Sequence, residues 1–191
     1  NSYEKNRYLF YTDYHSIELY VFNHLVLDNF FKNTLRGFPF NGKQTLKALE
    51  PILIDKFLLR LLIISEFPKY IASIAKFDKC ISLKSKKLDS LYGDVDKFLN
   101  ILLAECKQTK AKSTYSLKLK NLRKSLRKDT RLYIHGHDFI TLLFFSIDKI
   151  KNNIDLTQMT FERIIFQYID FSELRKEALF KKLEGKYSKL L

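Results

Sequence analysis

Glycine and proline are scarce in this sequence, which contains five glycines and three prolines among its 191 residues. A β-sandwich or a β-barrel needs many turns, and these two residues supply most of the tight ones. Their scarcity argues against an all-β fold. Helices need few such residues, so the composition favours a helical protein.

Cysteine is also scarce. Cys80 and Cys106 are the only two, and two are too few for a disulfide framework or for a four-cysteine zinc site. Free cysteines are commonly buried in proteins. We therefore interpret both as buried thiols of a reducing cytosol, and we expect a cytoplasmic protein.

Long apolar runs are missing as well. The most apolar stretch, Pro51 to Ile64, is interrupted by Asp55, Lys56 and Arg60. A membrane-spanning helix needs about 20 mostly apolar residues with few charges. The sequence therefore predicts no transmembrane span and no membrane partner.

Basic residues, by contrast, are abundant. The chain has 34 Lys and Arg against 21 Asp and Glu, a formal net charge of +13. Such an excess favours a polyanionic partner such as nucleic acid. Hydrophobic residues make up 46% of the chain and include 17 phenylalanines, so disorder is excluded as the general state of the chain.

Hydrophobic periodicity predicts a mainly α protein, a helical bundle with one short strand near the N-terminus at residues 7–12. A helix is expected to begin at Ser16, which would cap it, and to run to Phe31. Pro51 is expected to interrupt the following helix, because proline has no N–H to donate. The later helices are expected at Thr45–Ile64, Pro68–Phe77, Leu88–Cys106, Tyr115–Lys128, Asp138–Lys151, Phe161–Asp170 and Ser172–Tyr187.

Positive charge is concentrated in one segment. Residues 107–131 contain ten Lys or Arg and a single acid, Asp129. Helical spacing would place several of these cations on one face, opposite Leu119, Leu122 and Leu126. Two interpretations stay open: a solvated surface, or a ridge that contacts phosphates without reading sequence. The candidate nucleic-acid-binding residues are Lys120, Arg123, Lys124, Arg127 and Arg131.

A first polar cluster lies between the expected strand and the first helix. It contains Asp13 and Glu18, which would meet at one edge of a sheet if the strand belongs to an α/β core. Two neighbouring carboxylates can hold Mg²⁺. The alternative is that Asp13 and Ser16 cap the helix and Glu18 complements its dipole.

A second polar cluster comprises residues 131–139. Here His135 and His137 flank a glycine at the expected start of a buried helix. A zinc site is disfavoured, because a His-x-His pair needs further ligands. A helical RNase of the HEPN type would use Arg131 and His137, which are separated by five residues. The alternative is a helix cap with Asp138 on the dipole.

Taken together, the two clusters resemble a known family. The segment Phe10 to Tyr20, which includes Asp13 and Glu18, resembles the strand–turn–helix unit that follows the acidic core of TOPRIM-domain anti-phage defence nucleases. His135 to Phe139 resembles their late Gly-His-Asp segment. The best match is to AriB-like effectors of the PARIS system, with a more distant likeness to OLD-family nucleases.

The resemblance implies a domain organisation. Residues 1–35 would be the end of a TOPRIM-like α/β core, 36–130 a helical insert that carries the basic segment 107–131, and 131–191 a C-terminal helical segment that returns to the core. The chain starts at Asn1 rather than at Met. We therefore expect it to be the C-terminal part of a longer α/β protein, whose remaining acidic residues precede Asn1.

The resemblance also implies a function, namely Mg²⁺-dependent cleavage of RNA, such as tRNA, or of DNA in abortive infection. Asp13, Glu18 and His137 would then be catalytic, with Asp13 and Glu18 as metal ligands. An ATPase sensor subunit would be the partner, and a homodimer is compatible with this reading. Two alternatives stay open: a metal-independent HEPN-type RNase, and a non-enzymatic basic helical module that binds nucleic acid or a protein.

Overall fold

One long helix, α2 (Gly42–Glu66), organises the molecule. The structure is a computed structural model that describes residues 17–108, 111–152 and 154–187. It is mainly helical with one small antiparallel sheet, which confirms the expected mainly α fold. The strand expected at residues 7–12 lies outside the described residues. The other elements are η2 (Ile17–Val21), α1 (His24–Asn33), η3 (Pro68–Cys80), β1 (Ile81–Leu83), η4 (Leu88–Ser90), β2 (Leu91–Gly93), α3 (Val95–Glu105), α4 (Lys112–Lys124), η5 (Thr130–Leu132), α5 (Gly136–Lys151), α6 (Gln158–Phe166), α7 (Phe171–Leu174) and α8 (Ala178–Tyr187).

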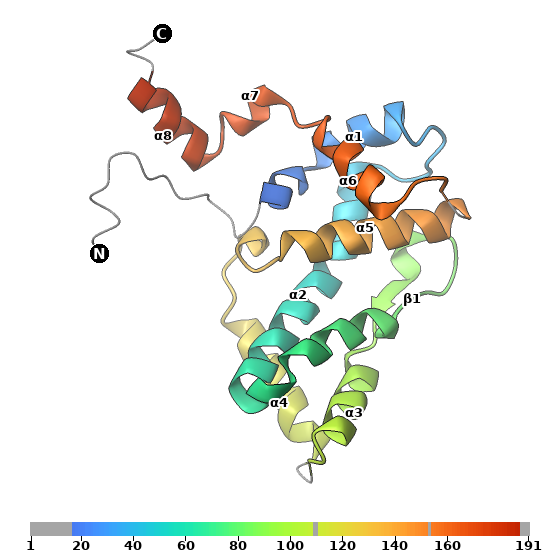
Figure 1. Ribbon diagram of the computed structural model, residues 1–191, viewed down its shortest axis with the longest axis vertical. Coiled ribbons are helices and arrows are strands. Elements are labelled where there is room, and N and C mark those ends of the chain that lie inside the picture. The colour runs from blue at the N-terminus through green and yellow to red at the C-terminus, as the bar shows by residue number, and fades with distance from the viewer. Residues whose placement is uncertain (1–16, 109–110, 153, 188–191) are drawn as a thin grey trace.

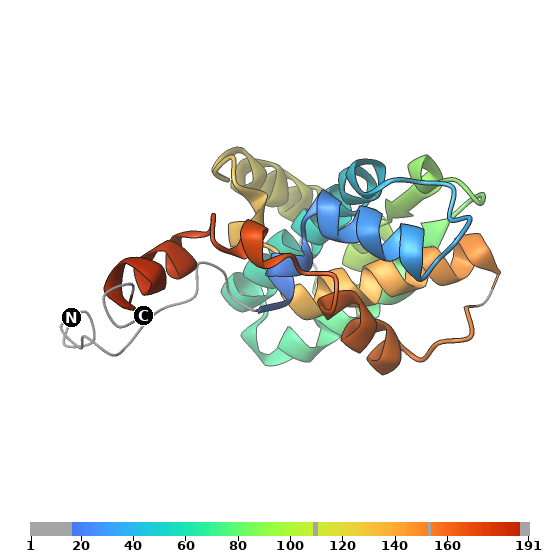
Figure 2. The ribbon, with the colours of Figure 1, turned by 90° about the horizontal axis from the view of Figure 1, so that it is seen from above.

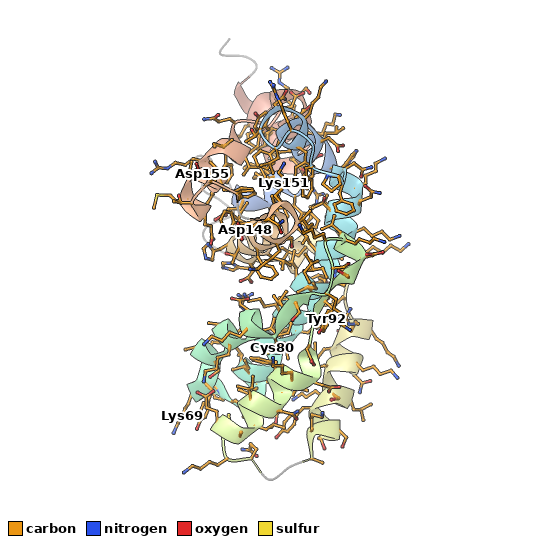
Figure 3. The ribbon with its side chains drawn as sticks, turned by 90° about the vertical axis from the view of Figure 1, so that its right-hand side faces the viewer. Lys69, Cys80, Tyr92, Asp148, Lys151 and Asp155 are labelled. Carbon is orange, nitrogen blue, oxygen red and sulfur yellow. The ribbon has the colours of Figure 1, made fainter. Side chains whose placement is uncertain are left out.

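Helix α2 connects two groups of helices (Figure 1). Its 25 residues span about 37 Å at the usual rise per residue. The first helical group, formed by η2, α1, α5 and α6, packs around its N-terminal part. The second helical group, formed by η3, α3 and α4, packs around its C-terminal part. Figure 3 shows the same division from the side, with α2 running between the groups.

The start of α2 is fixed by local chemistry. Asn41 caps the helix, and the side chains of Asn41 and Gln44 bond reciprocally to each other's backbone N–H groups. The N–H of Gly42 donates to the Asp28 carboxylate of α1 at 2.7 Å. A Cβ atom at Gly42 would lie 2.2 Å from the backbone oxygen of His24. Only glycine therefore allows α1 and α2 to approach this closely.

The expected interruption of α2 at Pro51 is wrong. The helix continues through Pro51, whose side chain lies on an exposed part of its surface. Proline removes one hydrogen bond, the one that residue 51 would donate to the carbonyl of Lys47. Packing against both helical groups keeps the helix continuous in spite of that loss.

The helix expected from Leu88 to Cys106 is also wrong in its first part. Strands β1 and β2 form an antiparallel hairpin in which Ser82 pairs with Tyr92, and α3 begins only after it. Asp94 ends the hairpin by accepting a hydrogen bond from the N–H of Lys97 at 2.8 Å, which caps α3. The strands have three residues each, too short to show a period-2 pattern.

Other boundaries differ by a few residues. The helix expected over Ser16–Phe31 is divided into η2 and α1, and Asn23 is the residue that caps α1. Helix α4 ends at Lys124, not at Lys128. The last expected helix is divided into α7 and α8. Figure 2 shows these two leading away from the rest of the molecule.

Phenylalanine rings fill the core of the first helical group. Phe30 of α1 meets Phe161 of α6 edge to face, with ring centroids 5.2 Å apart. Phe22 meets Phe139 of α5 in the same way at 5.0 Å. Such pairs add to the stabilisation from burial alone. No helix within the described ranges is both long and apolar enough to cross a membrane.

Candidate functional site

The described end of the first polar cluster lies against the second cluster in the first helical group. Element η2, which contains Glu18, packs against α5, which contains His137. The Phe22–Phe139 ring contact lies at this junction. Glu18 is half-buried and His137 is exposed. Residues more than a hundred positions apart are thus carried on touching elements.

The metal site expected at Asp13 and Glu18 stays a prediction, because Asp13 lies outside the described residues. Within the ranges that are described, no group of three His, Cys, Asp or Glu residues could hold a metal ion. The described residues by themselves therefore do not fit a Mg²⁺ site.

Asp138, the neighbour of His137, belongs to a buried ion-pair cluster. Its Oδ1 accepts from Lys56 Nζ at 3.0 Å, and its Oδ2 pairs with the guanidinium of Arg60. Lys56 Nζ also lies 2.5 Å from Oδ1 of Asp78. The side chains of Lys56 and Asp138 are only 7% and 8% exposed. The cluster thus joins α2, η3 and α5 where the two helical groups meet.

The electrostatics of this cluster keep Asp138 ionised. Burial by itself raises the pKa of a carboxyl group, but the hydrogen bond from Arg60 and the charge of Lys56 outweigh it. The pKa of Asp138 is therefore lower than its usual value. An anion that stays ionised at neutral pH does not serve as a proton donor there. Asp138 anchors α5 and holds His137 at the surface.

A small cavity adjoins the ion-pair cluster. Its volume is about 80 Å³, and Lys56, Asp78 and Asp138 line it together with apolar residues of α2 and α5. That space is sufficient for a few water molecules beside the buried charges.

The interpretation of Asp138 as a residue that only complements the helix dipole is incomplete, because Asp138 also pairs with Lys56 and Arg60. The missed signal is the i,i+4 pair Lys56 and Arg60 inside an apolar run, since buried cations need a buried anion.

The predicted basic ridge is only partly available to a ligand. Arg123 forms an ion pair with Asp55 of α2. Arg131 pairs with Asp129 at 3.3 Å and with Glu177 at 3.0 Å. These two arginines are therefore engaged in ion pairs within the molecule, an outcome that spacing alone did not reveal.

The shared helical face expected for the ridge extends only as far as Lys124. Helix α4 ends at Lys124, and Ser125 is its C-terminal cap. The Ser125 Oγ donates a hydrogen bond to the carbonyl of Leu122 at 2.7 Å. Arg127 and Arg131 follow in a turn and in η5. Leu119 is buried as expected, so the apolar side of α4 was predicted correctly.

Four cations near the end of α4 remain open to solvent. They are exposed, and none forms an ion pair with any described residue. We call this set the α4 basic surface: Lys120, Lys124, Arg127 and Lys128. The backbone N–H of Arg127 donates to the hydroxyl of Tyr133 at 2.9 Å, which fixes the turn.

The cysteines offer no nucleophile. Cys80 is buried and Cys106 is half-buried, and both are free thiols. Burial raises the pKa of each thiol above its usual value. The thiol form, which is a weak nucleophile, therefore dominates at neutral pH.

The HEPN-type alternative, which pairs Arg131 with His137, stays a prediction. The guanidinium of Arg131 points to Asp129 and Glu177, while His137 is exposed at the start of α5.

Comparison with known proteins found no matching family model, no matching curated protein and no matching solved structure.

Proposed function

We propose that this protein binds the phosphate backbone of a nucleic acid through the α4 basic surface. The observation that carries the proposal is that Lys120, Lys124 and Arg127 are exposed and unpaired among the described residues, while neighbouring cations are engaged in ion pairs. Cations without internal partners are the ones that can release counterions from a phosphate chain.

The spacing of these cations suits a backbone rather than a single small anion. Lys120 and Lys124 lie one helical turn apart on the same face of α4. Arg127 extends the surface along the following turn, where the bond to Tyr133 fixes its backbone. A row of separated charges grips several successive phosphates and carries little sequence information.

The test is a binding titration with a variant that removes three of these charges. A fluorescently labelled transfer RNA and a DNA duplex of similar length serve as probes for the wild type and for K120A/K124A/R127A. We expect the variant to bind both at least about tenfold more weakly at about 0.1 M salt.

The matched control is K32A/K69A/K79A, which removes the same net charge from exposed lysines elsewhere. Lys69, labelled in Figure 3, projects outward from the second helical group. The control should bind as the wild type does. Equal losses in both triple variants would mean that net charge, and not the α4 basic surface, attracts the nucleic acid.

Magnesium-dependent cleavage of the bound strand is the second candidate function. The observation that favours it is the packing of η2 on α5, which brings together the segments of Glu18 and His137. The family resemblance of these segments assigns Mg²⁺-dependent phosphodiester hydrolysis. Because the described residues do not form a complete metal site, the remaining ligands must come from elsewhere in the protein.

A cleavage assay separates this candidate from the HEPN-type alternative. In the first case, EDTA, E18Q and H137A each abolish cleavage of RNA or DNA, and R131A does not. In the second, EDTA has no effect, while R131A and H137A abolish cleavage of RNA. E177Q is the control for R131A, because it removes the Arg131–Glu177 ion pair and keeps the guanidinium. If the protein never cleaves either probe, only binding remains.

A further inference from the structure

A second surface of the molecule has the features of a ligand site. A groove of about 720 Å³ lies between the N-terminal half of α2 and the connection from β1 to β2. That volume is within the usual range for small-molecule sites, about 300 to 1,000 Å³. The hairpin lies beside the upper part of α2 (Figure 1). None of the four residues of the α4 basic surface lines it.

One wall of the groove is aromatic and firmly supported. Phe40 is half-buried, and its ring meets that of Phe38 edge to face at 5.8 Å. Phe38 in turn packs on the buried Phe31 at 4.5 Å. The floor is supplied by Leu88 and Leu91, which are buried. A flat ring can therefore enter against apolar surface whose position is already set.

The rim of the groove is basic. Lys47, Lys86 and Lys87 line it and are exposed, and none forms an ion pair with the described part of the chain. Asp89 is the one acidic residue among those lining it. Three cations around an apolar floor favour a ligand that is both anionic and planar.

The backbone of the loop that carries Lys86 and Lys87 is fixed before any ligand arrives. Ser90 Oγ lies 2.7 Å from the carbonyl oxygen of Lys87 and 3.0 Å from that of Ser85, and its single hydrogen can donate to either. The N–H of Ser85 donates back to Ser90 Oγ at 3.0 Å. These bonds close the β1–β2 connection into a fixed loop, which reduces the entropy lost on binding.

The wall that α2 provides contains Lys47 and Pro51, one turn apart. The aromatic wall and the basic rim together match the base and the phosphates of one kind of molecule.

We propose that this groove binds a nucleotide. The base lies against Phe40 and Leu88, and the phosphates contact Lys47, Lys86 and Lys87. This proposal goes beyond backbone binding at the α4 basic surface and does not depend on it. A free nucleotide and the terminal nucleotide of a strand share this chemistry, and the test distinguishes them.

The test is a fluorescence titration of the full chain with N-methylanthraniloyl-ADP. We expect saturable binding that K86A/K87A weakens at least about tenfold, because hydrogen bonds to charged groups are lost. F40L should weaken binding of the probe by about tenfold, because stacking of the base on the ring is lost. The concentration of inorganic tripolyphosphate needed to displace the probe should stay unchanged. Displacement by ADP identifies a free nucleotide, and displacement only by a short single-stranded oligonucleotide identifies a strand end.

The controls separate this proposal from the proposed function. K69A/K79A removes two exposed lysines outside the groove, and K120A/K124A/R127A alters only the α4 basic surface. Both should bind the probe as the wild type does, and thermal melts should show that every variant is folded. The proposal is overturned if the probe does not bind saturably, if K69A/K79A loses as much affinity as K86A/K87A, or if polyglutamate displaces the probe as well as ADP does.

Discussion

At the scale of single residues, the buried ion-pair cluster matters most for stability. Removing a charge from water is costly, and the cost is recovered only when its partners are well placed. Asp138 is bonded to both Lys56 and Arg60, which come from consecutive turns of α2. Because these residues lie between the two helical groups, their pairing ties the groups together.

Replacing Asp138 by Asn should destabilise the protein strongly. The variant D138N keeps the shape of the side chain and removes its charge, which leaves the buried Lys56 without this anion. We expect the free energy of unfolding to fall by about 3 kcal/mol, the usual cost of breaking a buried pair. Urea denaturation of D138N and the wild type measures this difference.

The control for D138N is D55N. Asp55 also pairs with an arginine, but the side chain of Arg123 is 46% exposed, and burial raises the pKa of Asp55 in spite of that arginine. Because the arginine of this pair is exposed, we expect the pair to contribute at most about 1 kcal/mol. A loss from D55N as large as that from D138N would contradict the special role assigned to the buried cluster.

The contribution of Asp138 should depend on pH in a defined direction. Its pKa is lower in the folded state than in the unfolded state. The stabilisation is therefore complete above the unfolded-state pKa, about 3.9, and is lost as the pH falls through the folded-state pKa. The stability difference between the wild type and D138N should be constant near neutral pH and should shrink below about pH 4. A difference that grows on acidification would contradict this assignment.

At the scale of elements, α2 is the clearest example of tertiary packing overriding a local signal. Pro51 indicated a break, yet the helix is continuous from Gly42 to Glu66 because both helical groups pack on it. The hairpin is the opposite case. Its short strands carry no pattern of their own and are defined by their pairing and by the Asp94 cap.

Replacing Pro51 by Ala should stabilise α2. The substitution restores the N–H that donates to the Lys47 carbonyl and removes the steric conflict within the helix. Proline costs up to about 3 kcal/mol relative to alanine in a helix interior. We therefore expect the free energy of unfolding of P51A to rise by about 1 to 3 kcal/mol in thermal or urea denaturation. A fall in stability would show that packing of the Pro51 ring outweighs the lost hydrogen bond.

The sequence predicted the secondary structure well where apolar residues repeat with helical spacing over several turns. The α5 helix and the buried side of α4 follow from spacing, since apolar residues repeat along one face. The pairs Arg123–Asp55, Arg131–Glu177 and Asp138–Arg60 did not follow, because each joins residues more than forty positions apart. Spacing identifies a charged residue but not the distant group that neutralises it.

At the scale of the whole molecule, the distribution of charge decides the functional interpretation. The net charge of +13 does not by itself identify a binding surface, because exposed cations lie on several parts of the molecule. What remains at the end of α4 is a short row of exposed cations without partners in the described part of the chain. The proposed α/β core and domain division of residues 1–35, 36–130 and 131–191 stay predictions.

The most direct test of backbone binding is the salt dependence of affinity for a DNA duplex. The slope of log K against log salt reports the number of phosphates that the protein neutralises, at about 0.9 per contact. K120A/K124A/R127A should reduce the magnitude of that slope by about 2 to 3, as expected for three lost contacts, and K32A/K69A/K79A should leave it unchanged. An identical slope in the wild type and K120A/K124A/R127A would contradict the assignment of the α4 basic surface.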